Sequence, residues 1–291
     1  MYAILIPFFL AADVVVNNTS EWTYGPEYLY DVNISFILKP EHHRPVEYYQ
    51  VIATINCRPK MPDHLSCHFN NATQMDSIKN NNASHVLHME EKFEIKFNER
   101  GVEGVIVEPN TPADTVNVIR KFATQFNVAV DRSNIGMSHF MVRENSSMGN
   151  CATTYSVTHE NPGTDTEGDF RLVVLPLADA KPGTTLSIEK SRTECIDSPR
   201  HFEVSDAILE MFLQERFVSN IQINQKKFES SSEIDAKVKY IRSEIEVWSN
   251  TELIHVKLNS IEPAKNELPM LFYGGLIDLN IKNGIPNNLI V

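Results

Sequence analysis

Cysteine and histidine are the side chains of this 291-residue chain that most readily take part in covalent or metal chemistry. Cys57 and Cys67 lie at the two ends of a turn-forming run, residues 58–63, which contains two prolines. In an oxidising compartment these two cysteines can close a disulfide across a hairpin, although spacing alone does not prove it. We therefore expect a disulfide at this turn.

A zinc site is the alternative for the same segment. His64 and His68 lie beside the two cysteines, and together they would supply two thiolates and two imidazoles. We favour the disulfide because secreted cysteines usually pair with each other, and because the spacing matches no standard zinc finger. The sequence therefore predicts no metal site.

Motifs that carry catalytic chemistry do not occur in the sequence. It has no Gly-X-Ser-X-Gly, no His-Glu-X-X-His, no phosphate-binding loop and no glycine fingerprint following a strand. We therefore expect a non-enzymatic protein without a cofactor, although a bound lipid stays open.

Asparagine glycosylation is the covalent modification that the sequence favours. Sequons of the form Asn-X-Ser/Thr begin at Asn17, Asn18, Asn33, Asn71, Asn82 and Asn145. Any single sequon can arise by chance in an asparagine-rich chain, so position must help to choose among them. Asn33 belongs to the outward set of an alternating strand, and a glycan there would point to solvent.

Composition and charge limit the class of protein. A hydrophobic content of 42% suits one large domain or two small ones with an ample core. The net charge of −12 disfavours nucleic acid and anionic membrane surfaces, which both require positive charge on the protein.

The first residues predict secretion. The apolar run from Ala3 to Ala12 is shorter than the roughly 20 residues that span a bilayer, so no transmembrane segment is expected. It is typical of a signal peptide, residues 1–12, although no positive charge precedes it. Residues 13–20 then form a loose polar segment, and residues 21–291 form one secreted domain.

The hydrophobic pattern predicts mainly antiparallel β structure. Residues 22–38 and 92–98 alternate cleanly, and the turn at residues 98–101 leads into a second strand, residues 102–107, which makes a hairpin. Later alternating segments predict a meander that continues to a last strand at residues 272–279. Residues 205–213 stay open between a short helix and a strand.

A single amphipathic helix interrupts this β pattern. Thr111 can cap it, Pro112 suits its first turn, and Asp114 completes a helix-start signature. Apolar residues between Val116 and Phe126 occupy one half of the helical wheel. The inner face of the neighbouring sheet is the apolar surface on which that half can pack, so we expect a sheet wrapped on a helix.

The run from Lys92 to Val107 with the following helix resembles the N-terminal domain of vitellogenins, which are large lipid transfer proteins. Other residues agree in order and spacing: Trp22, Gly25, Glu27, Tyr28, Tyr30, Gly149, Asn150, Cys151, Tyr155, Lys190, Arg192 and Cys195. The resemblance covers roughly residues 21–280. It implies a mainly β fold, an antiparallel β-barrel around a central helix, and a disulfide between Cys151 and Cys195.

The same resemblance implies a function. It indicates a secreted glycoprotein of the lipid transporter and yolk-storage superfamily, with a cell-surface receptor of the vitellogenin or lipoprotein receptor type as partner. Full-length vitellogenins continue into a helical arch and sheets that enclose lipid, and this sequence stops where the arch would begin. Receptor or surface recognition is therefore expected in preference to a full lipid cavity. The alternative is an extracellular recognition module, immune or receptor-binding, that transports no lipid.

Overall fold

The fold is mainly antiparallel β structure with one long helix. The computed structural model describes residues 22–40, 45–60, 62–76, 83–87, 89, 91–98, 101–129, 137–160, 183–196, 201–204, 208–224, 227–240, 246–268, 271 and 274–280. Within these ranges the chain forms a sheet of fourteen strands and the helix α2 (Ala113–Thr124). No helix in these ranges is long and apolar enough to cross a bilayer.

The strands fall into two groups separated by α2. The first six are β1 (Pro26–Pro40), β2 (Glu47–Lys60), β3 (His64–Asp76), β4 (Ala83–Leu87), β5 (Lys92–Asn98) and β6 (Gly101–Val107). The others are β7 (His139–Ser146), β8 (Gly149–Glu160), β9 (Thr185–Ile196), β10 (His201–Val204), β11 (Ile208–Asn224), β12 (Lys227–Tyr240), β13 (Glu246–Pro263) and β14 (Gly275–Ile277).

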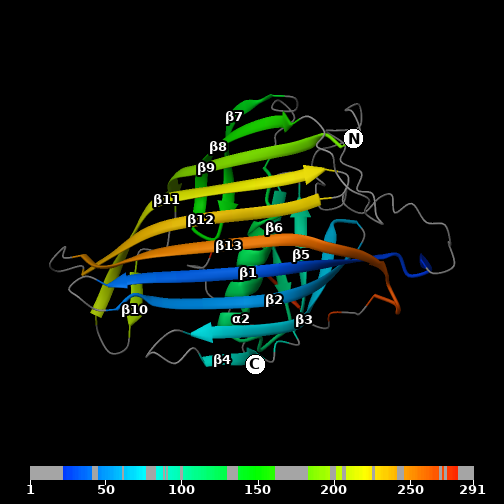
Figure 1. Ribbon diagram of the computed structural model, residues 1–291, viewed down its shortest axis with the longest axis horizontal. Helices are drawn as coiled ribbons and strands as arrows, with labels where there is room; N and C mark the ends of the chain where they lie inside the picture. Colours follow the sequence, from blue (N-terminus) through cyan, green and yellow to red (C-terminus); the bar gives the residue numbers. More distant parts are fainter. Residues whose placement is uncertain are drawn as a thin grey trace.

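Strand β13 joins the two groups in the middle of the sheet. The order across the sheet is β14-β6-β5-β3-β2-β1-β13-β12-β11-β9-β8-β7, while β4 and β10 pair with β3 and β11 (Figure 1). The register of β1 with β13 places Pro26 opposite Pro263. The start of β1 and the end of β13 therefore lie side by side at the centre of the sheet.

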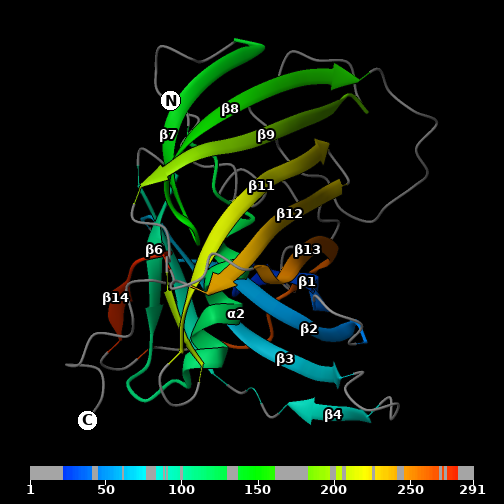
Figure 2. The same cartoon turned by 90° about the vertical axis from the view of Figure 1, so that its left-hand side faces the viewer.

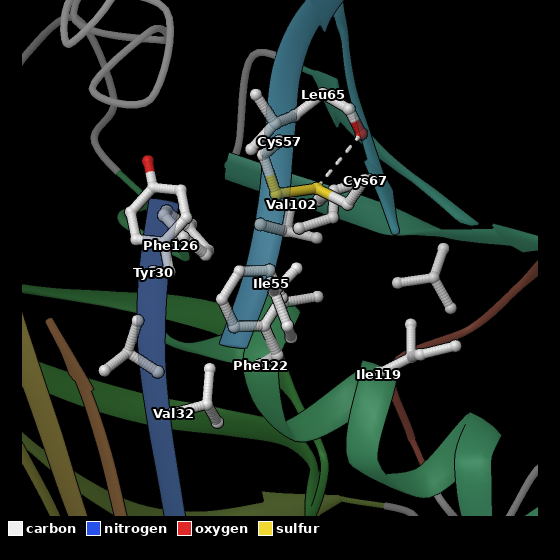
Figure 3. Packing of buried hydrophobic residues seen from close by; sticks show 14 of the residues in the cluster. Tyr30, Val32, Ile55, Cys57, Leu65, Cys67, Val102, Ile119, Phe122 and Phe126 are labelled. Atoms are coloured by element: carbon white, nitrogen blue, oxygen red, sulfur yellow. Dashed lines mark hydrogen bonds between the residues drawn. A yellow bond between two sulfur atoms is a disulfide. The ribbon is translucent and has the colours of Figure 1, made fainter. Parts of the chain in front are cut away.

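The sheet curls around α2, which lies against its inner face (Figure 2). Alternation along the strands gives that face its apolar side chains, and α2 supplies Phe122, with Phe126 just beyond its end. Tyr30 packs edge to face on both phenylalanines, at ring-centroid distances of 5.7 and 5.3 Å (Figure 3). Phe228 stacks on Phe126 at 5.2 Å. The helix is thus fixed to strands from both groups.

The sheet is open, so the expectation of a closed barrel is wrong. Strands β14 and β7 stand at its two ends and do not pair with each other. The side chain of Asn127 bridges β6 and β7. Its Oδ1 accepts a hydrogen bond from Val102 N–H at 2.9 Å, and its Nδ2 donates to Asn145 O at 2.6 Å. Because one side chain satisfies both backbones, these strands stay apart without unpaired polar groups at that point.

The start of α2 also differs from its sequence signature. Pro112 occupies the N-cap position, and no side chain caps the helix. Thr111 turns its hydroxyl back to donate to Glu108 O at 2.8 Å, closing the preceding turn. The predicted capping role of Thr111 is therefore wrong, although the helix begins where it was expected.

Most predicted strands are confirmed, with changes at their ends. The hairpin of β5 and β6 pairs Asn98 with Gly101, as the turn residues predict. Residues 208–213 belong to β11, so the helical alternative for 205–213 is wrong over that part. The last strand is shorter than residues 272–279, since β14 contains three residues.

Candidate functional site

Five polar residues meet beneath the opening between β6 and β7, and we call them the seam cluster. Asn127 follows α2, while the strands contribute Glu144 from β7, Tyr155 from β8, and Lys190 and Arg192 from β9. Alternation puts Lys190 and Arg192 on the same inward face. Arg192 Nε lies 2.6 Å from Glu144 Oε1, and Lys190 Nζ lies 3.6 Å from the same oxygen. Tyr155 donates its hydroxyl hydrogen to Glu144.

Burial and an excess of positive charge set the protonation of this cluster. Burial on its own would raise the pKa of the Glu144 carboxyl, but Arg192, Lys190 and the hydrogen bond from Tyr155 hold it below its ordinary value. Burial, with the Arg192 charge beside it, lowers the pKa of Lys190 to about 7. One carboxylate thus balances one guanidinium, and Lys190 is the second, uncompensated cation.

Hydroxyl and amide groups extend the seam cluster to the end of the helix. Arg192 Nη1 donates to Ser219 Oγ at 2.5 Å, and Ser219 lies 3.1 Å from Ser232 Oγ. Ser230 and Ser232 both donate to Gln125 Oε1, at 2.9 and 3.0 Å. These side chains are buried. The network therefore holds the end of α2 to strands β7, β9, β11 and β12.

A hollow lined mainly by polar side chains lies over five neighbouring strands of the sheet, and we call it the outer hollow. It has a volume of about 570 Å³ and extends over β8, β9, β11, β12 and β13. The strand register arranges its floor in two rows that cross the strands. The first row is Ser156, Glu189, Asn220, Ser231 and His255. The second row is Thr154, Ser191, Val218, Glu233 and Leu253.

The four cysteines form two disulfides. Cys57 and Cys67 face each other across β2 and β3, because the connecting turn is tighter than residues 58–63. Their sulfurs are bonded to each other, so neither is available as a zinc ligand. His64 Nδ1 lies 2.7 Å from Asp63 Oδ1, and the described residues contain no group of three or more potential metal ligands. Cys151 is bonded to Cys195, which ties β8 to β9.

The sequons differ in their surroundings. Asn71 and Asn145 are exposed, whereas Asn33 is half-buried and its Oδ1 accepts hydrogen bonds from Gln50 and Ser35. Asn145 Oδ1 accepts a hydrogen bond from Asn150 Nδ2 at 2.8 Å. Asn17, Asn18, Asn82 and the signal peptide expected at residues 1–12 lie outside the described residues. Glycosylation therefore stays a prediction.

The structure brings together residues that lie far apart in the sequence. Tyr155, Lys190 and Arg192 were noted for their order and spacing, and they converge on Glu144, which sequence reasoning missed. Glu144 could have been found from the sequence as an acidic residue at an inward-facing position of the strand that became β7. Asn127 was also missed, because nothing local distinguishes it from the exposed asparagines. The rows of the outer hollow depend on register and had no local signal.

The described residues thus form an open antiparallel sheet wrapped on one helix, with a buried ionic cluster that joins the end of the helix to the sheet. The sequence profile of the vitellogenin N-terminal domain matches residues 50–240, more than half of the chain. The chain belongs to this family, which places it in the lipid transfer superfamily.

A solved structure gives the same fold. The chain is similar to a lipovitellin described for its lipid–protein interactions, with 12% identity and a TM-score of 0.60. The match covers 92% of this chain and 28% of the lipovitellin chain. No curated protein matches this chain. At this identity the likeness shows the fold alone, and the chain spans under a third of that structure.

Proposed function

We propose that this chain is a secreted, non-enzymatic recognition module of the lipid transfer superfamily, and that its own interior holds no lipid. The observation that carries the proposal is the filling of the inner face of the sheet by α2. Tyr30, Phe122, Phe126 and Phe228 close on one another there, each with at most 2% of its surface exposed. An acyl chain would have to displace this packing, which costs several kcal/mol for each large side chain that is moved.

The outer surface offers the chemistry of recognition. The outer hollow is lined by hydroxyl, amide and charged side chains, with only Val218, Leu253 and Ile254 apolar. Such a surface suits a polar partner better than an acyl chain. Two disulfides and six sequons support an extracellular location, where such a partner would be met.

Native mass spectrometry of the full chain, secreted from eukaryotic cells, tests the proposal. Spectra are taken before and after enzymatic removal of N-glycans, and again after organic extraction. We expect the mass of the protein with two disulfides and its glycans, and extraction should not change it. Saturable binding of the same sample to cultured cells would support recognition. About one phospholipid per chain would overturn the lipid-free proposal.

Lipid transport is the second candidate, and family membership is the observation that favours it. In this case the chain would contribute one wall to a larger lipid carrier, or would hold lipid in a reduced pocket. Stoichiometric lipid that leaves on extraction would support this candidate. A lipid-free protein that binds cells saturably would instead support the receptor-binding or immune recognition module.

A further inference from the structure

We propose that the outer hollow binds a lysine or arginine side chain presented by an extended, basic segment of a partner protein. This inference rests on the proposed recognition function and names the surface and the partner chemistry. It places the cationic head over Asn220 and Glu189, and the aliphatic stem over Val218 and Leu253.

Strand register creates the depth of the hollow. Asn220 of β11 faces Glu189 of β9 on one side and Ser231 of β12 on the other. The row beside it places Val218 between Ser191 and Glu233 in the same way. Small serine side chains therefore lie next to larger ones in both rows, and we infer that the floor is lowest at the serines.

The first row contains two groups, Asn220 Oδ1 and the Glu189 carboxylate, that can accept hydrogen bonds but receive none from the described residues. Asn220 Oδ1 is buried and has no hydrogen-bond partner, but the residue as a whole is only half-buried, so rotation of its amide would bring this oxygen to a ligand in the hollow. A buried acceptor without a partner costs about 1 to 3 kcal/mol, and a ligand that donates to it would recover that cost. The exposed Glu189 carboxylate beside it makes no hydrogen bond or ion pair among the described residues. The Asn220 oxygen and the Glu189 carboxylate therefore favour a ligand that donates hydrogen bonds and carries positive charge.

The second row offers apolar contact at the right separation. Val218 and Leu253 stand two residues along their strands from Asn220 and His255, which is about 7 Å in an extended chain. Lysine and arginine bury apolar stems of this length while their charged heads contact polar groups. A single side chain lying along β11 would therefore meet both rows at once.

Charge selects against the other ligand classes. Arg216 is the cation at the edge of the hollow, and it is already engaged by Glu233 at 2.9 Å and Asp235 at 3.9 Å. Lys190 also borders the hollow, but its buried Nζ donates to Asn127 O at 2.5 Å and lies 3.6 Å from Glu144 Oε1. A phosphate or sulfate group would therefore meet carboxylates, with each cation already engaged. No phenylalanine, tyrosine or tryptophan is among the described residues that line the hollow, so a sugar would find no large aromatic ring on which to stack. The net charge of −12 also attracts a basic partner over a distance.

The test uses the full secreted chain and a fluorescein-labelled nonapeptide of alternating lysine and glycine. Fluorescence anisotropy at 50 and 150 mM salt should show saturable binding that weakens with salt. Glu189→Gln should weaken binding about threefold, as expected for an exposed charge pair. Ser231→Trp should abolish it, because the indole would fill the hollow from an exposed position. The peptide with glutamate in place of lysine should not bind.

Matched controls separate binding from folding and from charge. Glu160→Gln makes the same charge change at an exposed position at the end of β8, and should leave the affinity within twofold of wild type. Ser191→Tyr fills the hollow from another strand and should repeat the effect of Ser231→Trp. Thermal unfolding of each variant should match wild type. Wild-type affinity in either filled variant would overturn the inference.

A parallel measurement keeps this inference separate from the proposed function. Binding to cultured cells is recorded for wild type and for Ser231→Trp. Equal cell binding by both would overturn the role of the hollow while leaving recognition in place. Stoichiometric lipid in the purified protein would overturn the proposed function, whatever the peptide does. Loss of peptide and cell binding together in Ser231→Trp supports both.

Discussion

The side-chain amide of Asn127 occupies the space where a Cβ on Gly101 would stand. Gly101 also has φ of +102°, a conformation that strains any other residue. We therefore expect Gly101→Ala to lower the free energy of unfolding by about 3 kcal/mol, from strain and from displacement of the amide. Gly25→Ala is the matched control, since Gly25 has φ of +80° with nothing within 4 Å of a Cβ. Equal losses in urea unfolding of the two variants would contradict this account.

Removal of the Glu144 carboxylate should be costly. Glu144→Gln leaves Arg192 and Lys190 buried without a counter-charge, and we expect a loss of about 3 to 5 kcal/mol in the free energy of unfolding. Glu233→Gln breaks the exposed pair with Arg216 and should cost less than about 1 kcal/mol. Urea denaturation measures both. A loss of less than about 1 kcal/mol in Glu144→Gln would show that Arg192 and Lys190 can reach solvent once the carboxylate is removed.

Lys190 should make stability depend on pH. Its folded-state pKa is about 7, whereas the unfolded chain keeps this proton up to about pH 10.4. Between these values the unfolded state binds more protons, so Lys190 makes stability rise with pH, by at most about 1.4 kcal/mol per unit. Below pH 7 both states are protonated and this contribution to the slope disappears. The difference between wild type and Lys190→Met, measured in urea from pH 6 to 9, should therefore grow with pH.

The surface lysine Lys96 provides the control for that experiment. It pairs with Glu103 at 3.1 Å and is partly exposed. Lys96→Met should follow the pH profile of wild type. Parallel profiles for the Lys190 and Lys96 variants would mean that burial does not shift the titration of Lys190.

The two disulfides should contribute unequally. On the chain-entropy relation, the Cys151–Cys195 bond with its sequence separation of 44 contributes about 4 kcal/mol. The Cys57–Cys67 bond spans 10 residues and contributes about 3 kcal/mol. Unfolding of the two paired Cys→Ala variants measures the difference. A larger loss at Cys57 and Cys67 would show that packing, not loop closure, dominates their effect.

Asn71 is the sequon that we expect to carry a glycan. It is exposed, and no residue in the described part of the chain contacts its amide through a hydrogen bond in the way that Gln50 contacts Asn33. Asn71→Gln should remove one glycan mass from the secreted protein. Asn70→Gln, at the adjacent exposed position, keeps the sequon and should leave the mass of the glycans unchanged. An identical glycan mass in both variants would contradict the assignment.

Local pattern predicted the elements of this fold well, because alternation and the helical wheel report burial directly. The strand with Tyr30 and the helix with Phe122 were both predicted, and both are buried where expected. Closure of the sheet was predicted wrongly, from the resemblance, because it depends on the position of the edge strands β14 and β7 relative to each other. That position is set by tertiary packing and leaves no periodic signal.

The candidate sites, too, could be predicted only in part from local sequence. Tyr155, Lys190 and Arg192 could be noted individually, but their common partner Glu144 could be found only when three strands, β7, β8 and β9, were brought together. The outer hollow depends on register across five strands, and a shift of one residue in any of them would remove it. Thr111 shows the reverse case, because a good local signature was overruled by a hydrogen bond to Glu108.

The position of β13 has a consequence for how the chain folds. Residues 26–107 and 139–240 each form neighbouring strands, but β1 and β12 remain open edges until β13 is inserted between them. A nascent chain that has emerged only to residue 240 thus presents two unpaired strands to other chains. We expect such a fragment to aggregate or to engage chaperones, and the joining of its halves to await synthesis of residues 246–263.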